Sequence, residues 1–400
     1  MLENIGYIVM QFGDSSWFTV IIIVSWLVFF VMYLPQMLMM NPKIALMNLR
    51  KSVAELEGWA KEGRKIALSA ITKHGRPKGD IEKEFDNFLE FFAIEPVSED
   101  PAGVLRRLEH VLDVRKRRFE GAVAGFAPKA NSEEAANLEM TIEGAMASYW
   151  LFRVVRHFML LAEKTKSSVF IMSLQMQMPI LKEYAKAFLN ATKTFAQGKP
   201  IGDGIGAMVA TKLIGDASCK EFVEDTVYAE TKFDGRKLIV VKAKGPGGRV
   251  GKPGELIRRL MERRKINRII MIDAALKLEG EASGQIIEGV GAAIGGPPTE
   301  KYKIEEVAVK QLVPVDAMVI KESFKEAIGP INKRLAKAAD ATVERVKHAI
   351  RERTKPGDTV VVAGIGNTIG IGQSAKELPK EFPEVKEEEK GIESDRLLFR

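Results

Sequence analysis

The stretch DTVVVAGIGNTIGIGQ, residues 358–373, reads as a buried strand that opens into a glycine-rich loop. In nucleotide-binding folds such a loop leads directly into a helix, whose amino end binds phosphate. Here the chain continues with SAKELPKEFPEVKEEEK, in which prolines and dense charges predict no helix. The loop also departs from the dinucleotide-binding pattern, because Gly370 comes one residue late after Gly364 and Gly366. We therefore expect these glycines to permit close approach by another backbone segment.

The stretch GKPIGDGIGAMVATKLIGD, residues 198–216, has the complementary pattern, a loop that runs into a helix without a strand before it. A strand that lacks its following helix and a helix that lacks its preceding strand fit together in a circularly rearranged α/β domain. The sequence therefore predicts that the last strand lies beside the helix that begins near Ala207.

Three further strand candidates precede the one at 359–366, at residues 236–243, 267–274 and 316–323. Helical patterns separate them, and this alternation predicts a C-terminal α/β domain with a mainly parallel sheet covered on both faces. The two incomplete motifs are compatible with a circularly permuted order of the strands in that sheet. Ligands of such sheets bind at the carboxyl ends of the strands, where this chain has its glycine-rich loops.

Composition narrows the class of protein further. The 400 residues are 46% hydrophobic and 28% charged, which is typical of a globular protein with two or three domains. The single cysteine, Cys219, excludes an internal disulfide and multi-cysteine zinc sites, and the four histidines lack a ligand spacing. The net charge of +7 is compatible with anionic lipid or nucleic acid but does not mark a dedicated binder. Abundant Lys, Arg and Glu with scarce Gln lean towards a thermophile.

An uncharged segment near the start predicts a membrane anchor. Residues 18–40 are long enough, at 1.5 Å rise per residue, to cross about 30 Å of hydrocarbon. A cleaved signal peptide fits less well, because the start lacks Lys and Arg and the apolar run is long. A buried core helix is rarely so uniformly apolar. We expect residues 17–41 to form one transmembrane helix in the cell membrane, and the basic residues that follow place the rest of the chain in the cytoplasm.

Residues 42–198 have a helical texture and predict a separate domain, because apolar residues recur there at spacings of three and four. The basic run 115–118 fits a lipid or nucleic-acid surface or a solvated helix face, and the lack of interleaved aromatics favours the second. The Met-rich stretch 172–178 is expected in a helix–helix core, not in a copper site. The predicted organisation is 1–16 outside the membrane, 17–41 transmembrane, 42–198 helical, 199–375 α/β and 376–400 a mobile charged tail.

The glycine-rich loop GPGGRVGKPGE, residues 245–255, does not match the P-loop pattern. Gly247 and Gly251 are separated by three residues instead of four, and Pro253 replaces the hydroxyl residue that holds magnesium. Backbone amides and cations ahead of a helix still suit an anion, so the alternatives are an anionic ligand or a plain tight turn. The residues expected to contact an anion are Lys244, Gly247, Gly248, Arg249, Lys252, Gly364, Gly366 and Asn367.

Short motifs of the C-terminal lobe are similar to those of the hydrogenase-maturation protease family. The sequence has GIGN at 364–367, GDGIG at 202–206 and IDA at 272–274, and its DAAL is similar to a stretch of the spore-protease relatives of that fold. The resemblance implies that the acids of the site are Asp203 and Asp273.

Over nearly all of its length the chain also resembles an archaeal family of single-anchor membrane proteins, defined only as domain of unknown function 1512. Besides the N-terminal anchor, the stretches that carry this resemblance are DGIGAMVATKLIGD, KGPGGRVGKPGE, IDAALKLEGE, GVGAAIGG and GIGNTIGIG. The resemblance implies no particular activity.

Two functions of different classes fit the sequence, and only the first makes the protein an enzyme. A membrane-anchored hydrolase or peptidase would use Asp203 and Asp273 as an acid/base pair, or as ligands of a divalent metal ion together with Glu279 or Glu288. The structural alternative is that Asp203 caps the next helix and Asp273 accepts hydrogen bonds from loop amides. The hydrogenase-maturation family also supplies a histidine ligand, whereas His348 is expected inside a helix, which puts metallopeptidase chemistry in doubt.

The second function is a non-catalytic sensor or scaffold whose α/β lobe binds an anionic metabolite or nucleotide through the glycine-rich loops. A nucleic-acid role ranks third, because the basic run 258–268 has an ordinary explanation as a solvated helix face. No specific nucleic acid is therefore predicted, and nothing in the sequence predicts an oligomeric state.

Overall fold

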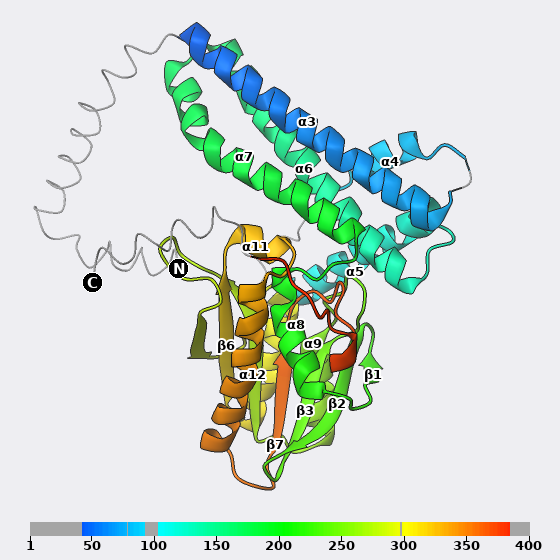
Figure 1. Ribbon diagram of the computed structural model, residues 1–400, viewed down its shortest axis with the longest axis vertical. Coiled ribbons are helices and arrows are strands. Elements are labelled where there is room, and N and C mark those ends of the chain that lie inside the picture. Colours follow the sequence, from blue (N-terminus) through cyan, green and yellow to red (C-terminus); the bar gives the residue numbers. More distant parts are fainter. Residues whose placement is uncertain (1–41, 78, 93–102, 297, 385–400) are drawn as a thin grey trace, which may run out of the picture. The chain divides into compact units, whose positions relative to one another are not determined.

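The computed structural model describes most of the chain after the predicted anchor (Figure 1). The predicted transmembrane segment 17–41 lies outside the described residues, as does the end of the predicted tail. Among the residues described, no helix combines the length and the apolar character that a membrane span requires. The described residues are 42–77, 79–92, 103–296 and 298–384.

These residues belong to two compact units, and three long helices contribute segments to both. We call them the helical unit and the main unit, and each is described by itself. The boundary predicted near residue 198 falls inside the main unit and stays a prediction. Of the described residues, 42–58 and 151–183 form the helical unit, and 59–150 and 184–384 form the main unit.

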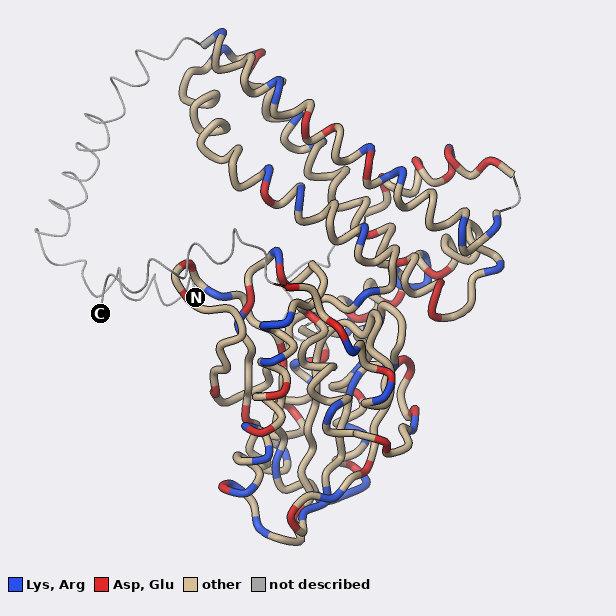
Figure 2. Tube along the Cα trace, in the orientation of Figure 1, with Lys and Arg blue, Asp and Glu red and all other residues tan. Residues whose placement is uncertain are grey.

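The helical unit contains the start of α3, the end of α6 and most of α7. Helices α3 and α7 run in the same direction, since Gln175 Nε2 donates to the Ala45 carbonyl (3.3 Å) and Lys182 pairs with Glu55 (2.9 Å). Helix α7 carries no charged residue over 168–181 (Figure 2). Buried apolar side chains recur at helical spacing and form the core. They include Leu49, Val53, Phe152, Val155, Ile171 and Leu174, and the helices span Pro42–Gly75 (α3), Ser132–Thr165 (α6) and Ser168–Ala196 (α7).

The main unit begins with helices that pack around an aromatic core. The rings of Phe85 and Phe126 meet edge to face with centroids 5.9 Å apart, and Phe88 contacts Phe119 in the same way at 5.0 Å. Apolar residues on one face of α5 and α6 complete this core, so the helices are held by side-chain burial. The two helices of this part that lie wholly in the main unit are α4 (Glu82–Phe88) and α5 (Val104–Phe126).

A seven-stranded mixed sheet forms the rest of the main unit, with the order β1-β2-β3-β7-β4-β6-β5. The four predicted strands, β3, β7, β4 and β6, are parallel neighbours in its centre. The expectation of a mainly parallel sheet was incomplete, because antiparallel β1 and β2 extend one edge and antiparallel β5 extends the other. The strands are Lys220–Val223, Thr226–Phe233, Arg236–Ala243, Arg268–Leu276, Ile286–Val290, Val315–Glu322 and Thr359–Gly364, numbered β1 to β7.

Strand β7 is buried on both faces, which explains its continuous run of β-branched residues. Val360 and Val362 pack in the core under α8 and α12, whereas Val361 and Ala363 pack in the core under α9 and α10. The sheet is therefore the middle layer of three. The helices after residue 200 are α8 (Ile205–Ile214), α9 (Pro253–Arg263), α10 (Pro298–Gln311), α11 (Phe324–Ile328) and α12 (Lys333–Arg353), with 3-10 turns η1 (Gly202–Gly204) and η2 (Ala375–Glu377).

The last strand lies directly against the start of α8, as expected from the two incomplete motifs. A Cβ atom on Gly364 would overlap the Gly206 carbonyl oxygen, and one on Gly206 would overlap the carbonyl oxygens of Ile272 and Ile365. Backbone therefore meets backbone at this point, and only glycine permits such a distance. The close approach places the loops at 202–206 and 364–372 on one end of the sheet.

Candidate functional site

Asp203 lies in the 3-10 turn η1, immediately before α8. Its Oδ2 atom accepts a hydrogen bond of 3.0 Å from the backbone N–H of Asn367, which follows β7. The structural alternative of a helix cap does not hold, because α8 has no side-chain cap and its N-cap residue is Gly204. A side chain on Gly366 (φ +122°) would overlap the Asp203 carbonyl, so the two glycine-rich segments form one surface.

Asn367 and Thr368 hold the loop after β7 in place. The Asn367 Oδ1 atom accepts from the Ile369 N–H (2.8 Å), and its Nδ2 atom lies 3.5 Å from the Met140 sulfur. The fully buried Thr368 hydroxyl lies within 3.1 Å of three carbonyl oxygens, those of Lys244, Gly247 and Arg249, which share its single proton. Thr368 thus fastens the loop at 245–251 to the loop after β7, a role that sequence reasoning missed.

Asp273 ends the buried part of β4 and is only 5% exposed. Its two oxygens accept hydrogen bonds from the backbone N–H groups of Ala274 (2.8 Å) and Gly295 (2.6 Å), as the structural alternative expected. Burial nevertheless raises the pKa of Asp273 to about 7. The hydrogen bond from Gly295 lowers this pKa, and the nearby charge of Asp203 raises it further. Burial also raises the pKa of Asp203 itself.

A third carboxyl group, Glu322, ends β6 and is 1% exposed. Neither of its oxygens has a hydrogen-bond partner among the described residues. Burial, followed by the charges of Asp203, Glu326 and Asp273, raises its pKa well above the ordinary value. The sequence contained a signal for this residue, because the alternation of β6 puts position 322 on the same buried face as Ile320. We call Asp203, Asp273 and Glu322 the interior carboxylates.

Glu326, four residues further on, has the opposite environment. Its carboxylate accepts hydrogen bonds from Ser283 Oγ (2.6 Å), the Ser323 N–H (2.9 Å) and Asn332 Nδ2 (3.0 Å). Burial alone would raise the pKa of Glu326, but these hydrogen bonds outweigh it and the pKa is lowered. Ser323 and Glu326 also form the capping box of α11, so this acid has a structural role.

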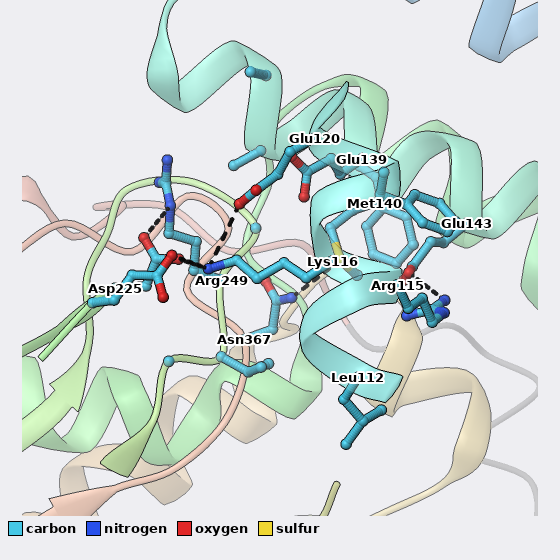
Figure 3. Close-up of a pocket in the computed structure, with 18 of the residues that line it drawn as sticks. Leu112, Arg115, Lys116, Glu120, Glu139, Met140, Glu143, Asp225, Arg249 and Asn367 are labelled. Atoms are coloured by element: carbon cyan, nitrogen blue, oxygen red, sulfur yellow. Dashed lines mark hydrogen bonds and ion pairs between the residues drawn. The ribbon is translucent and has the colours of Figure 1, made fainter. Parts of the chain in front are cut away.

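A cavity of about 840 Å³ opens between α5, α6 and the loops at the carboxyl ends of the strands (Figure 3). Asp203 and Asn367 belong to its wall, whereas Asp273 and Glu322 are not among the described lining residues. Nine acidic and four basic side chains of the described residues line it, which makes the cavity acidic. Of the residues predicted to bind an anion, Gly248, Arg249, Lys252 and Asn367 line it, and Lys244, Gly247, Gly364 and Gly366 do not.

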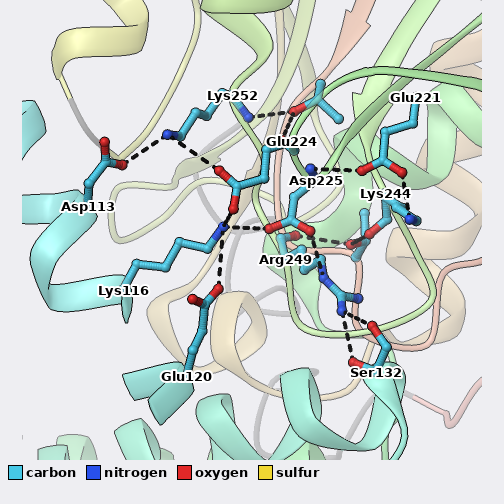
Figure 4. Close-up of polar contacts among 12 residues, drawn as sticks. Asp113, Lys116, Glu120, Ser132, Glu221, Glu224, Asp225, Lys244, Arg249 and Lys252 are labelled. Atoms are coloured by element: carbon cyan, nitrogen blue, oxygen red, sulfur yellow. Dashed lines mark hydrogen bonds and ion pairs between the residues drawn. The ribbon is translucent and has the colours of Figure 1, made fainter. Parts of the chain in front are cut away.

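The cations at this cavity are held in ion pairs (Figure 4). Lys116 contacts Glu224 (2.9 Å) and Asp225 (2.7 Å), and Arg249 Nε lies 3.0 Å from Asp225. Lys252 pairs with Asp113 (2.9 Å), and Lys244 pairs with Glu221 (2.6 Å). Each predicted anion-binding cation is thus already neutralised by an acid. We call Glu221, Glu224 and Asp225 the rim acids.

Glu139 is a further acid of the cavity that sequence reasoning missed. Burial raises its pKa to about 7, and the neighbouring Glu120 contributes. Among the described residues it has no hydrogen bond or ion pair, and Figure 3 shows it beside Glu120. The spacing of Ala136, Glu139, Met140 and Glu143 on α6 could have indicated a shared helix face.

Glu279 and Glu288, the further ligands predicted for a metal ion, do not join Asp203 and Asp273 among the described residues. The described part of the chain has no group of three His, Cys, Asp or Glu side chains that could hold a metal ion. Glu279 is exposed on the loop after β4, so it does not complete a ligand set with Asp203 and Asp273. Glu288 is also engaged elsewhere, because it pairs with Arg345 and Arg353.

Fold and site together define a three-layer α/β protein with an acidic cavity at the carboxyl ends of its strands. The chain belongs to the DUF1512 family, since two matches to that family cover most of its length. Residues 20–198 match the family described as protein of unknown function (DUF1512), N-terminal domain, and residues 201–372 match the DUF1512 C-terminal domain of unknown function. A search of the curated proteins gave no match.

Proposed function

We propose that the cavity is the active site of a hydrolase in which Asp203 is the catalytic acid/base. The observation that carries this proposal is the group of interior carboxylates, of which Asp273 and Glu322 are buried and Asp203 is half-buried. All three have a raised pKa and no paired cation among the described residues. Burying an acid without a cation is costly, and such perturbed groups concentrate at functional sites. Asp203 is the one of the three that lines the cavity.

The chemistry follows from this placement. When Asp203 is ionised, it can take a proton from a water molecule as the water oxygen attacks a carbonyl carbon. The same carboxyl group can then return that proton to the leaving nitrogen or oxygen as its bond to carbon breaks. Asp273, with a pKa of about 7, acts through Asp203 as a positioning residue, because the two carboxyl groups repel each other when both are ionised.

The cavity suits a substrate of small-peptide size. Its volume of about 840 Å³ lies within the range of small-molecule sites, and Phe119, Met140 and Phe195 give its wall apolar area. Glu139 is a second group in the same cavity with a pKa near neutrality. A substrate with an amide or ester bond could therefore contact apolar surface while its reacting carbonyl faces Asp203.

The test is to screen the full chain against fluorogenic peptides, amides and esters, in parallel with Asp203→Asn. General acid/base groups contribute roughly 100- to 10,000-fold, so we expect Asp203→Asn to lower kcat at least about 100-fold. Asp340→Asn is the matched control, because this exposed acid pairs with Lys212 on α8, outside the cavity. No turnover of any substrate class, or equal turnover by Asp203→Asn, would contradict the proposal.

Two other predictions from the sequence stay open beside this one. A non-catalytic sensor that binds an anionic metabolite or nucleotide would have to open the ion pairs of Lys244, Arg249 and Lys252. A rise in melting temperature with nucleotides would favour it. Anchoring of residues 17–41 in the cell membrane, with the bulk of the chain in the cytoplasm, is a proposal from the sequence alone. An archaeal and thermophilic origin of the protein is likewise a proposal from the sequence alone.

A further inference from the structure

We propose that one end of the helical unit binds the surface of an anionic lipid membrane. This end contains the start of α3, the end of α6 and the start of α7 (Figure 1). Large apolar side chains are exposed there: Val169 is 65% exposed, Met47 61% and Ile44 53%. We call this end the lipid-contact tip and define it by Ile44, Met47, Leu160, Lys164, Lys166 and Val169. The inference is independent of the proposed hydrolase.

The direction of the helices brings these residues to one end of the unit. Gln175 of α7 is hydrogen-bonded to Ala45 of α3. Val169 precedes Gln175 by six residues, so it lies about 9 Å from that contact along the axis of α7, near or past the first turn of α3. Leu160 and Lys164 lie in the last turns of α6, only a few residues before α7 begins. The residues of the tip are therefore neighbours although three helices contribute them.

Helix α7 is apolar on its outer face as well as on its inner face. Ile171, Leu174 and Met178 are buried in the unit, whereas Val169, Met176 and Ile180 follow one exposed stripe. No charge interrupts this part of the helix, as the uncoloured run of α7 in Figure 2 shows. Large apolar side chains exposed along one face of a helix are typical of an interaction site. No helix among the described residues could span a bilayer, so a contact in the interfacial plane remains.

Charge identifies lipid as the partner. Lys164 and Lys166 are exposed beside Leu160 and Val169, and neither has an ion pair among the described residues. The described residues of the helical unit contain eight Lys and Arg but four Asp and Glu. Apolar side chains flanked by lysines are typical of surfaces that insert between headgroups, where each Lys is attracted to the anionic surface.

The position of the tip in the chain supports the same partner. The uncharged stretch 18–40, predicted to span a bilayer, ends two residues before Pro42 begins α3. A predicted span and an apolar, basic surface thus adjoin in sequence, with no linker of a length that would separate them. A second copy of the chain or residues 1–41 could also cover the tip, and the experiment distinguishes these occupants.

The test uses the full chain with Cys219→Ser and one new cysteine that carries a fluorophore. Val169→Cys reports on the tip, and Ala54→Cys is the control, exposed on the same unit about 15 Å along α3 from Ile44. In vesicles that contain brominated phosphatidylserine, we expect the label at 169 to be quenched at least twofold more than the label at 54. Adding Lys164→Glu and Lys166→Glu should remove most of that difference, and vesicles of phosphatidylcholine alone should show less of it.

Three results would overturn the proposal. Equal quenching at the two positions in protein that floats with the vesicles would show that the tip has no preferential contact with lipid. Energy transfer between labels at 169 that rises with protein concentration, without lipid quenching, would assign the surface to a second copy. If the label at 169 is not quenched in the full chain but is quenched once residues 1–41 are deleted, the tip is covered by that segment.

Discussion

Two acid-rich regions meet at the carboxyl ends of the strands and have opposite electrostatics. Each rim acid lies beside a cation. The hydrogen bonds that Lys116 donates to Asp225 and Glu224 outweigh burial and raise the lysine pKa. The interior carboxylates have no paired cation among the described residues, and burial raises the pKa of all three. An acid that is paired with a cation therefore serves as structural support at the rim, whereas an acid without a paired cation can hold a proton in the interior.

The largest expected effect is a dependence of stability on pH that comes from the interior. The pKa of Asp273 rises from an ordinary 3.8 to about 7 on folding. Between those values the folded state holds a proton that the unfolded state has lost, so the unfolding free energy should fall as pH rises from about 4 to 7. Three pKa units correspond to up to ~4 kcal/mol. Chemical denaturation across this range measures it.

Asp273→Asn provides the control for that pH dependence, because the amide cannot titrate. Its unfolding free energy should vary less with pH than that of the natural chain over the same range, even if the loss of one acceptor lowers its stability throughout. Acids with lowered pKa, such as Glu255 at about 2, give the opposite slope and cancel in the difference. Parallel curves for the two chains would show that Asp273 is ionised in the folded protein.

The next effect is expected from the backbone that supports the interior carboxylates. Gly206→Ala would place a Cβ atom against the carbonyl oxygens of Ile365 and Ile272, and neither is the end of a flexible side chain. We expect a loss of about 3 kcal/mol or more in unfolding free energy. Gly58→Ala is the matched control, since a Cβ there meets no atom within 4 Å and Ala favours a helix by about 1 kcal/mol. Equal stabilities of the two variants would contradict the close approach of β7 to α8.

A pair of isosteric substitutions separates unpartnered from partnered acids directly. Glu326→Gln replaces a carboxylate that accepts from Ser283, Ser323 and Asn332, so it should cost about 1–3 kcal/mol. Glu322→Gln removes no hydrogen bond and should be neutral or stabilising. Because the pKa of Glu322 is raised in the folded state, the natural chain loses stability as pH increases above about 4.5. The stability of Glu322→Gln relative to the natural chain should therefore grow over that range. Thermal melting of both variants at two pH values would decide between these outcomes.

The smallest effect is expected at the rim. Asp225→Asn removes the charge that Lys116 and Arg249 share, but this acid is about a quarter exposed, so solvent screens the pairs. We expect a cost of about 1 kcal/mol or less, which should shrink further at high salt. A cost that is large and insensitive to salt would mean that the rim acids are as tightly coupled as the interior ones.

The sequence predicted the parts of the fold that depend on local pattern. Strands β3, β4 and β7 contain continuous apolar runs, whereas burial alternates along β6. The glycines of 202–206 and 364–372 indicated a close approach of two backbone segments. Strands β1, β2 and β5 were missed because charged residues or glycine interrupt their apolar residues, and β5 has no buried position. The separation of two strands along the sequence does not determine which strands pair with each other in the sheet.

The site was predicted less completely than the fold. Asp203 and Asn367 were found because they belong to glycine motifs, and the structure joins them by one hydrogen bond. Glu322 and Glu139 were missed because an acid in a strand or helix usually faces water, and burial depends on what packs over it. Lys244 and Lys252 were taken for anion contacts because their acidic partners, Glu221 and Asp113, lie on other segments of the chain.

The central place of β7 has a consequence for the nascent chain. Leu238 of β3 pairs with Val360 of β7, so more than a hundred residues must be synthesised before β3 meets its neighbour. At ribosomal rates of about 5–20 residues per second, the wait is roughly 5–25 s. During that time the inward edges of β3 and β4 both expose unsatisfied backbone groups, which invite pairing with other chains. We therefore expect a chaperone to bind the unfinished sheet until β7 has been synthesised.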